Sequence, residues 1–240
     1  MGEGLLGAES RFRELERRLG ALRGRVAAAC EGVGRDAAEV TVIAITKTFP
    51  GSDVRMLWEL GVLDVGENRD QEAAAKAAEC AGLAGLRWHF VGRLQTNKAA
   101  SVVRYASVVH SVDRVRLARV LGEQARKAER VITCLVQVSL DGDPARGGAL
   151  PADVPEVAAA VAAEDGLVLG GVMAVAPLEV PPPEAFAPLP AISAAVREIR
   201  PGATVISAGM SGDLEAAIAA GATHLRIGTA LLGGRPAFVR

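Results

Sequence analysis

The sequence predicts a (β/α)8 TIM barrel of the α/β class, and two observations lead to this fold. Short, mainly apolar segments, most of them rich in β-branched residues, recur eight times, and Ala-rich segments with helical periodicity separate most of them. Parallel strands that are buried on both faces have this composition, because neither face of their sheet meets water. Eight such units in 240 residues match the size of the barrel, so we expect one domain over residues 1–240.

The first predicted element is an amphipathic helix at about residues 9–30. Phe12, Leu15, Leu19 and Leu22 share one side of this helix, and Arg and Glu occupy the other. No βα unit of the barrel includes this helix, so we expect it to cover one mouth of the barrel as an extra N-terminal element.

The remaining elements alternate along the chain. The predicted strands are 40–45, 62–66, 86–91, 107–110, 131–138, 167–173, 204–207 and 223–227. Helices are predicted at 52–60, 69–80, 113–128, 152–163, 189–199 and 211–220, and the crossover near 94–103 is short. The segment 177–190 contains three successive prolines, which lack backbone donors and break helices, so we interpret it as a solvated loop.

Composition narrows the classes of function. The net charge is −1 and no basic cluster stands out, which gives no reason to expect nucleic acid or a membrane as a partner. The three cysteines are scattered without metal-ligand spacing, so neither a disulfide framework nor a metal site is predicted. Charged residues occur throughout positions 9–30 in place of an apolar signal core. We therefore expect a cytoplasmic protein, and nothing in the sequence marks an obligate interface, which favours a monomer.

Two predicted strands near the end of the chain run into segments suited to an anion. The segment 206–213 and the segment Arg226 to Thr229 both pass from apolar residues into Gly, Ser and Thr. Loops of this kind at helix starts present free N–H groups and hydroxyls, which suit a phosphate. In a barrel they lie at the ends of strands seven and eight, where this fold frequently holds phosphate.

Lys47 follows the first predicted strand. Its amine should emerge from a buried strand into a partly desolvated mouth, where more free amine can attack an aldehyde and form an imine. An aldehyde that also carries a phosphate would bridge Lys47 and the anion-binding loops, and pyridoxal phosphate (PLP) has both groups. Arg226 could bind the phosphate, or face the pyridine nitrogen and keep it unprotonated.

Seven segments of the chain resemble the pyridoxal phosphate homeostasis proteins, single barrels similar to the N-terminal domain of alanine racemase. These segments are 45–50 (ITKTFP), 66–72 (GENRDQE), 88–98 (WHFVGRLQTNK), 110–113 (HSVD), 171–173 (GVM), 206–213 (ISAGMSGD) and 226–229 (RIGT). They follow the family's order and spacing from about residue 10 to residue 235.

The resemblance implies a role for individual residues. Lys47 would carry PLP as a Schiff base, and Arg226 would face the pyridine nitrogen. Ser211, Gly228 and Thr229 would bind the phosphate, with Gly209 and Met210 shaping that loop. Asn68 would lie beside the cofactor, and Ser207 and Met173 belong to the site by their positions at strand ends. The family buffers PLP and delivers it, with PLP-dependent apoenzymes as recipients, so no catalytic residue and no robust turnover are expected.

Four positions depart from the family's common pattern. Arg69 stands where an aromatic residue is usual, Ala208 replaces a Met, and Ser139 replaces a frequent Asn. Arg146 stands where a lysine is common, and arginine cannot form a simple imine, which bears on any transfer step through a second lysine there.

Two alternative functions compete with a carrier. An amino-acid racemase of this kind needs a tyrosine as second base, supplied by a C-terminal domain, and the one tyrosine here, Tyr105, precedes strand four. An aldolase-like barrel would form imines with sugar phosphates and would be colourless, whereas a PLP imine is yellow. Among other polar residues, His89 is interpreted as a hydrogen-bonded structural residue, His110 stays undecided, and Glu67 is expected to orient its neighbours.

Overall fold

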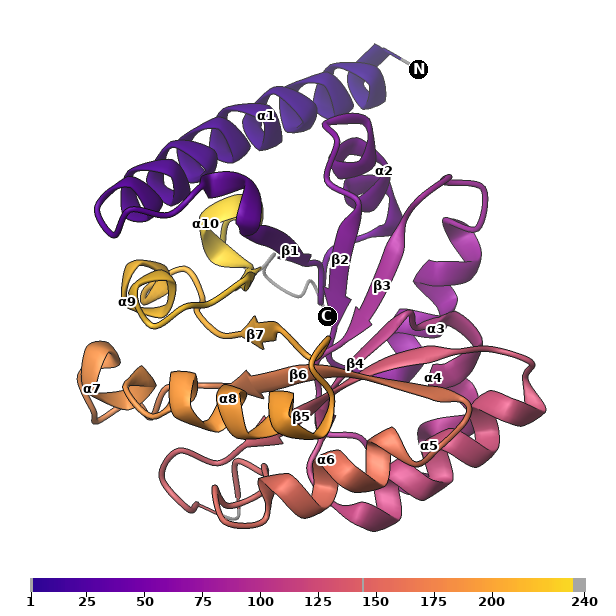
Figure 1. Cartoon of the computed structure of the whole chain (residues 1–240). Coiled ribbons are helices and arrows are strands. Elements are labelled where there is room, and N and C mark those ends of the chain that lie inside the picture. Colours follow the sequence, from indigo (N-terminus) through magenta and orange to yellow (C-terminus); the bar gives the residue numbers. More distant parts are fainter. Residues whose placement is uncertain (1, 144, 235–240) are drawn as a thin grey trace.

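Eight parallel strands close into a barrel in the order β1 to β8 (Figure 1). The computed structural model describes residues 2–143 and 145–234. The strands are β1 Thr41–Ile45, β2 Asp64–Glu67, β3 Arg87–Phe90, β4 Val108–Val112, β5 Ile132–Val138, β6 Leu167–Ala174, β7 Val205–Ser207 and β8 His224–Ile227. The last strand closes the barrel on the first, with Val42 opposite Leu225. The predicted fold class is confirmed, whereas residues 1, 144 and 235–240 of the predicted domain lie outside the described residues.

Helices surround the barrel as the sequence predicts. They are α2 Gly51–Glu59, α3 Asp70–Glu79, α4 Ala99–Tyr105, α5 Val115–Lys127, α6 Val154–Ala162, α7 Pro182–Phe186, α8 Leu189–Ile199, α9 Leu214–Ala219 and α10 Thr229–Leu232. Two 3-10 turns, Ala37–Glu39 and Thr96–Lys98, precede β1 and α4. Buried apolar side chains such as Val65, Trp88, Val109 and Leu121 belong to the core that joins strands and helices.

The N-terminal helix α1 (Gly2–Glu31) lies along the outer side of the barrel. It packs against α2, α9 and α10, so it occupies a place in the ring of helices beside β1 and β8 (Figure 1). Leu15, Leu19 and Leu22 are buried on its inner side, as the amphipathic pattern predicts. The prediction that this helix covers a mouth is wrong: its buried face packs on neighbouring helices.

The proline-rich segment is also more ordered than predicted. Pro182 begins the short helix α7, and α8 starts at Leu189. Proline is compatible with the first turn of a helix, because the N–H groups there have no partner within the helix. Phe186 is fully buried and joins the core. The interpretation of 177–190 as a solvated loop is therefore wrong for its second half.

No helix among the described residues is long and apolar enough to cross a membrane. Cys30, Cys80 and Cys134 are all buried free thiols. Burial raises the pKa of Cys134 to about 12, so this thiol stays protonated and behaves as a small apolar side chain.

Candidate functional site

Lys47 follows the end of β1 in a tight turn. Phe49 N–H donates to the carbonyl of Thr46 at 3.0 Å, which folds the chain back directly around Lys47. Thr48 has a φ of 70°, in the left-handed region that β-branched residues rarely adopt, and its buried hydroxyl has no partner among the described residues. Backbone strain of this kind is often found at functional sites. The half-buried side chain of Lys47, the residue before Thr48, lines the cavity at the mouth of the barrel.

A buried ion pair holds the end of β1 against β2 and α3. Lys76 Nζ lies 2.5 Å from Glu67 Oε1 and donates to the carbonyl of Thr46 at 2.8 Å. The hydroxyl of Thr46 donates to the same carboxylate oxygen at 2.6 Å. The expectation that Glu67 orients its neighbours is confirmed, because it fixes both the residue before Lys47 and a side chain of α3.

The loops after β7 and β8 lie side by side. Ala230 N–H donates to the hydroxyl of Ser211 at 3.1 Å, which joins the start of α10 to the loop before α9. Gly209 has a φ of 90°, and a Cβ there would lie 2.6 Å from the Cβ of Ala217. Only glycine fits this position, so Gly209 shapes the loop by letting α9 approach it closely. The predicted pair of anion-binding loops is thus assembled at one mouth.

Arg226 forms part of the floor between these loops and the lysine. Its Nη1 donates to the carbonyl and to the hydroxyl of Ser207, each at 2.7 Å, and Nη2 donates to the carbonyl of Ala174 at 2.7 Å. Burial lowers the pKa of Arg226 to about 10, which still leaves it charged at neutral pH. These bonds use three of the five N–H groups of a guanidinium, and Arg226 lines the cavity above it.

All these parts surround one cavity of about 450 Å³, a size typical of small-ligand sites, which span roughly 300–1,000 Å³. Eight of the ten predicted site residues line it: Lys47, Asn68, Met173, Met210, Ser211, Arg226, Gly228 and Thr229. Ser207 and Gly209 lie behind this lining, where Ser207 contacts Arg226 and Gly209 supports the loop. A binding role for each residue stays a prediction.

Several lining residues were not predicted. Phe49 and Gly233 lie at the rim, and Gly92 and Val175 follow β3 and β6. A Cβ on Gly92 would lie 2.0 Å from the carbonyl oxygen of Asn68, so glycine is required for the ends of β2 and β3 to meet. The position of Gly92 after a strand was a usable signal, because the carboxyl ends of all barrel strands converge on one mouth.

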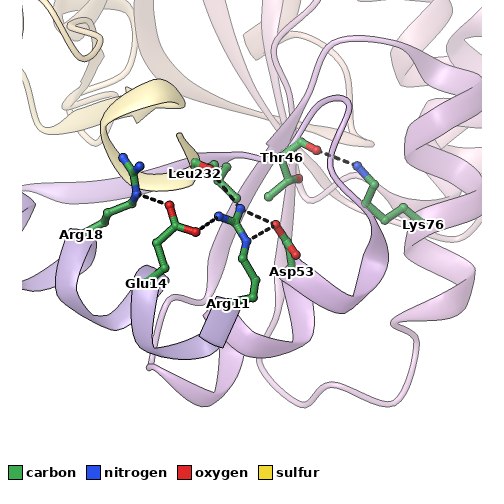
Figure 2. Close-up of polar contacts among 7 residues, drawn as sticks. All are labelled: Arg11, Glu14, Arg18, Thr46, Asp53, Lys76 and Leu232. Carbon is green, nitrogen blue, oxygen red and sulfur yellow. Dashed lines mark hydrogen bonds and ion pairs between the residues drawn. The ribbon is translucent and has the colours of Figure 1, made fainter. Parts of the chain in front are cut away.

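Arg11 of α1 joins two segments of this rim (Figure 2). Its guanidinium donates to Asp53 of α2 at 2.6 Å and to the carbonyl of Leu232 at 3.0 Å, and it lies 5.6 Å from the centre of the Phe49 ring. Figure 2 also shows the contact between Lys76 and Thr46 on the far side of the same turn. The first helix therefore fixes both the turn after Lys47 and the end of α10.

Comparisons with known proteins agree with this geometry. The family model of the alanine racemase N-terminal domain matches residues 20–236. The pyridoxal phosphate homeostasis protein of Mycobacterium tuberculosis is 45% identical, over 92% of this chain and 93% of the relative. The Escherichia coli protein of the same name is 35% identical, over 92% of this chain and 97% of the relative. The chain belongs to the pyridoxal phosphate homeostasis protein family.

Solved structures extend the comparison. The structure of PipY from Synechococcus elongatus with PLP bound has a TM-score of 0.80 and 33% identity, and the match covers 91% of this chain and all of PipY. Alanine racemase from Corynebacterium glutamicum is 13% identical with a TM-score of 0.67, over 95% of this chain and 62% of the racemase. This likeness shows only that the two proteins share the barrel fold.

The positions that depart from the homeostasis family's pattern lie outside the cavity lining. Arg69 is exposed and pairs with Glu72 at 3.1 Å. Ser139 accepts a hydrogen bond from Gly142 N–H at 3.0 Å. Arg146 donates to the carbonyls of Val175 and Ala176 at 3.2 and 2.7 Å and pairs with Asp141, so it holds the end of β6 beside the cavity.

Proposed function

We propose that this protein binds pyridoxal 5'-phosphate as a Schiff base on Lys47 and serves PLP homeostasis by buffering and delivering the cofactor. One observation carries the proposal: an amine at the end of β1 and the anion-binding loops after β7 and β8 line the same cavity. The names of the relatives and the PLP bound to PipY support the same ligand class.

The residues present fit this cofactor. When bound, PLP supplies an electrophilic aldehyde beside an aromatic ring and a phosphate dianion. Lys47 would hold the cofactor through its amine, as an imine with the aldehyde carbon formed with release of the carbonyl oxygen as water. The N–H groups and hydroxyls at Ser211, Gly228 and Thr229 bind the phosphate. Arg226 would face the ring nitrogen as a hydrogen-bond donor, which would keep that nitrogen unprotonated and disfavour transaminase-type turnover.

The environment of Tyr105 supports a carrier over a racemase. Its hydroxyl lies 3.4 Å from Asp70, and burial together with this carboxylate raises its pKa. A phenol in this state is a poor proton donor and acceptor at neutral pH. Tyr105 lies outside the cavity lining, so the tyrosine of this chain is not placed to act as a second base opposite Lys47.

The proposal is tested by titrating the protein with PLP and recording absorbance. Wild type should turn yellow, and borohydride should fix the cofactor covalently, as measured by intact mass. Lys47→Ala should give neither signal, whereas Lys127→Ala, which changes an exposed lysine paired with Glu123, should behave like wild type. A reducible adduct that persists in Lys47→Ala would refute the assignment.

The anion-binding loops are tested separately. Thr229→Val keeps the side-chain shape and removes a hydroxyl from the cavity lining, and we expect PLP to bind about tenfold more weakly, the loss of about one good hydrogen bond to a charged group. Pyridoxal without its phosphate should bind wild type and Thr229→Val equally weakly. Equal binding of PLP and pyridoxal by wild type would contradict the phosphate site. Delivery to PLP-dependent apoenzymes and the monomeric state stay part of the proposal.

A further inference from the structure

A chain of hydrogen bonds crosses the interior of the barrel and ends at Arg226. From Arg226 Nη1 it passes to Ser207 Oγ at 2.7 Å and to His110 Nδ1 at 3.0 Å. It continues from His110 Nε2 to His89 Nδ1 at 2.8 Å, and from His89 Nε2 to Asp64 Oδ1 at 2.8 Å. We call these five residues the interior chain.

The interior chain lies inside the barrel and spans it. His110 is on β4 and Ser207 on β7, and β5 and β6 separate these strands in the sheet, so their hydrogen bond must cross the interior. The five residues are all buried, with exposures between 0 and 6%. Branched apolar residues normally fill this space, and buried polar groups are tolerated when they are hydrogen-bonded.

The Asp64 end of the interior chain reaches the mouth of the barrel opposite the candidate PLP cavity. Arg87 donates to the second oxygen of Asp64 at 2.7 Å. Asp64 and Arg87 line a second cavity of about 520 Å³ together with the first residues of β1 and part of α1. The interior chain therefore joins the floor of the candidate PLP cavity to the N-terminal ends of the strands.

The donors and acceptors of the interior chain are ordered in one direction. A guanidinium can only donate, so Ser207 Oγ accepts from Arg226 and has one proton left for His110 Nδ1. At the other end, the Asp64 carboxylate can only accept, so His89 donates to it through Nε2. With both rings neutral, His89 Nδ1 then accepts from His110 Nε2–H, and His110 Nδ1 accepts from Ser207. Burial lowers the pKa of His110 well below its ordinary value, consistent with a neutral ring. Burial alone would raise the pKa of Asp64, but hydrogen bonds from His89 and Arg87 outweigh it and lower that pKa.

We propose that Ser207, His110, His89 and Asp64 are positioning residues for Arg226. They hold both imidazoles in the Nε2–H form and fix the guanidinium against the floor of the cavity. An arginine held in this way is already immobilised before the ligand arrives. Binding then costs less side-chain entropy. Its remaining N–H groups then meet a ligand atom that can accept a hydrogen bond, such as an unprotonated ring nitrogen. The identity of the ligand in this inference rests on the proposed function. The positioning of Arg226 rests on the hydrogen bonds of the interior chain.

The first test needs no cofactor. Imidazole nitrogen shifts of the 15N-labelled, unloaded protein distinguish the two neutral tautomers of each histidine. We expect His89 and His110 to carry their protons on Nε2 in wild type. In Ser207→Ala, which removes the donor to Nδ1, the His110 signals should move. A proton on Nδ1 of His110 in wild type would overturn the proposal, whether or not PLP binds.

The second test measures PLP affinity by absorbance titration. Ser207→Ala should weaken binding about tenfold, and Asp64→Asn, which lies outside the lining of the PLP cavity, should weaken it several-fold. The control is His224→Gln, on the same strand as Arg226, whose Nδ1 contacts Thr223 Oγ1 at 2.9 Å and takes no part in the chain. It should bind PLP like wild type.

The outcomes separate the two proposals. Wild-type affinity in both Ser207→Ala and Asp64→Asn would overturn the positioning role and leave the imine on Lys47 standing. Failure of wild type to bind PLP would instead overturn the proposed function, while the tautomers would still report on the interior chain. If a variant does not fold, the tautomers of wild type alone decide the positioning role.

Discussion

Lys47 and Lys76 lie beside the same strand end and have opposite surroundings. Lys76 is buried, paired with Glu67 and bonded to the carbonyl of Thr46. Lys47 follows Thr46 directly, lines the cavity, and pairs with no carboxylate among the described residues. Lys76 has a carboxylate and a carbonyl as partners, whereas Lys47 faces the cavity. The comparison teaches that Lys76 holds the strand end in place and that Lys47 is left available for chemistry.

The largest expected effect comes from breaking the buried pair. Lys76→Met leaves Glu67 charged and buried without its partner, and we expect the free energy of unfolding to fall by about 3–5 kcal/mol. Urea denaturation measures this change. Lys127→Met, at an exposed pair, should cost less than about 1 kcal/mol. If Lys76→Met and Lys127→Met cost the same, the contrast between the two lysines is wrong.

Removing both charges sharpens this result. The double variant Glu67→Leu, Lys76→Met replaces the pair with apolar groups, which is often close to neutral for stability. We expect it to recover more than half of the loss seen in Lys76→Met. Recovery would show that the cost comes from an unpaired buried charge, whereas no recovery would assign it to lost packing or to the contacts with Thr46.

At low pH the free energy of unfolding should depend on His224, which lies away from both lysines. Burial lowers the pKa of His224 to about 4. The unfolded histidine takes up a proton below about pH 6.5 and the folded one resists it. The stability is therefore full above about pH 6.5 and falls as the pH drops toward 4, by about 2–3 kcal/mol for this residue. Urea denaturation between pH 7.5 and 4.5 should show the fall, and His224→Gln should reduce it; an unchanged slope in that variant would contradict the assignment.

A smaller effect is expected from α1. Arg11→Ala removes the contacts with Asp53, Leu232 and the Phe49 ring, and should lower the free energy of unfolding by about 1–2 kcal/mol. It should also weaken PLP binding a few-fold, because Phe49 and Gly233 lie on the cavity rim. The matched control is Arg13→Ala, an exposed residue on the same helix that pairs with Glu9. If Arg11→Ala and Arg13→Ala have the same stability and the same PLP affinity, the expected role of α1 at the site is wrong.

The smallest effect belongs to Lys47 itself. Lys47→Met should change the free energy of unfolding of the unloaded protein by less than about 0.5 kcal/mol, since the change removes no ion pair among the described residues. Stability is measured by the same urea titration. A loss as large as that of Lys76→Met would mean that Lys47 has a structural role.

The fold and most of the cavity lining could be predicted because they depend on local sequence patterns. The sequence pattern of a strand buried on both faces, such as Val42 to Ile45, allows few other structural interpretations. The barrel then places the residue after each strand at one mouth. Lys47, Ser211 and Thr229 follow from those two rules. Helix α7 was missed because the prolines of the segment were interpreted as helix breakers, whereas their place in a first turn allows a helix.

Contacts between distant segments could not be predicted. Arg11 donates hydrogen bonds to Asp53 and Leu232, and His110 is hydrogen-bonded to Ser207. These partners are far apart in the sequence, and hydrophobic periodicity carries no information about such pairs. A charged residue on an amphipathic helix resembles any solvated one, and a histidine in an apolar strand resembles a packed one. Only the tertiary fold brings these partners together.

Closure also determines when the site can exist during synthesis. The register of β1 against β8 pairs Thr41 with His224, so the edge of the first strand stays open until the ribosome has made the eighth. The amine of Lys47 emerges early in translation, whereas the loops proposed to hold the phosphate emerge only after β7 and β8. A nascent chain therefore exposes Lys47 long before the β7 and β8 loops exist, and under the proposed function cofactor loading must wait until β8 has been made.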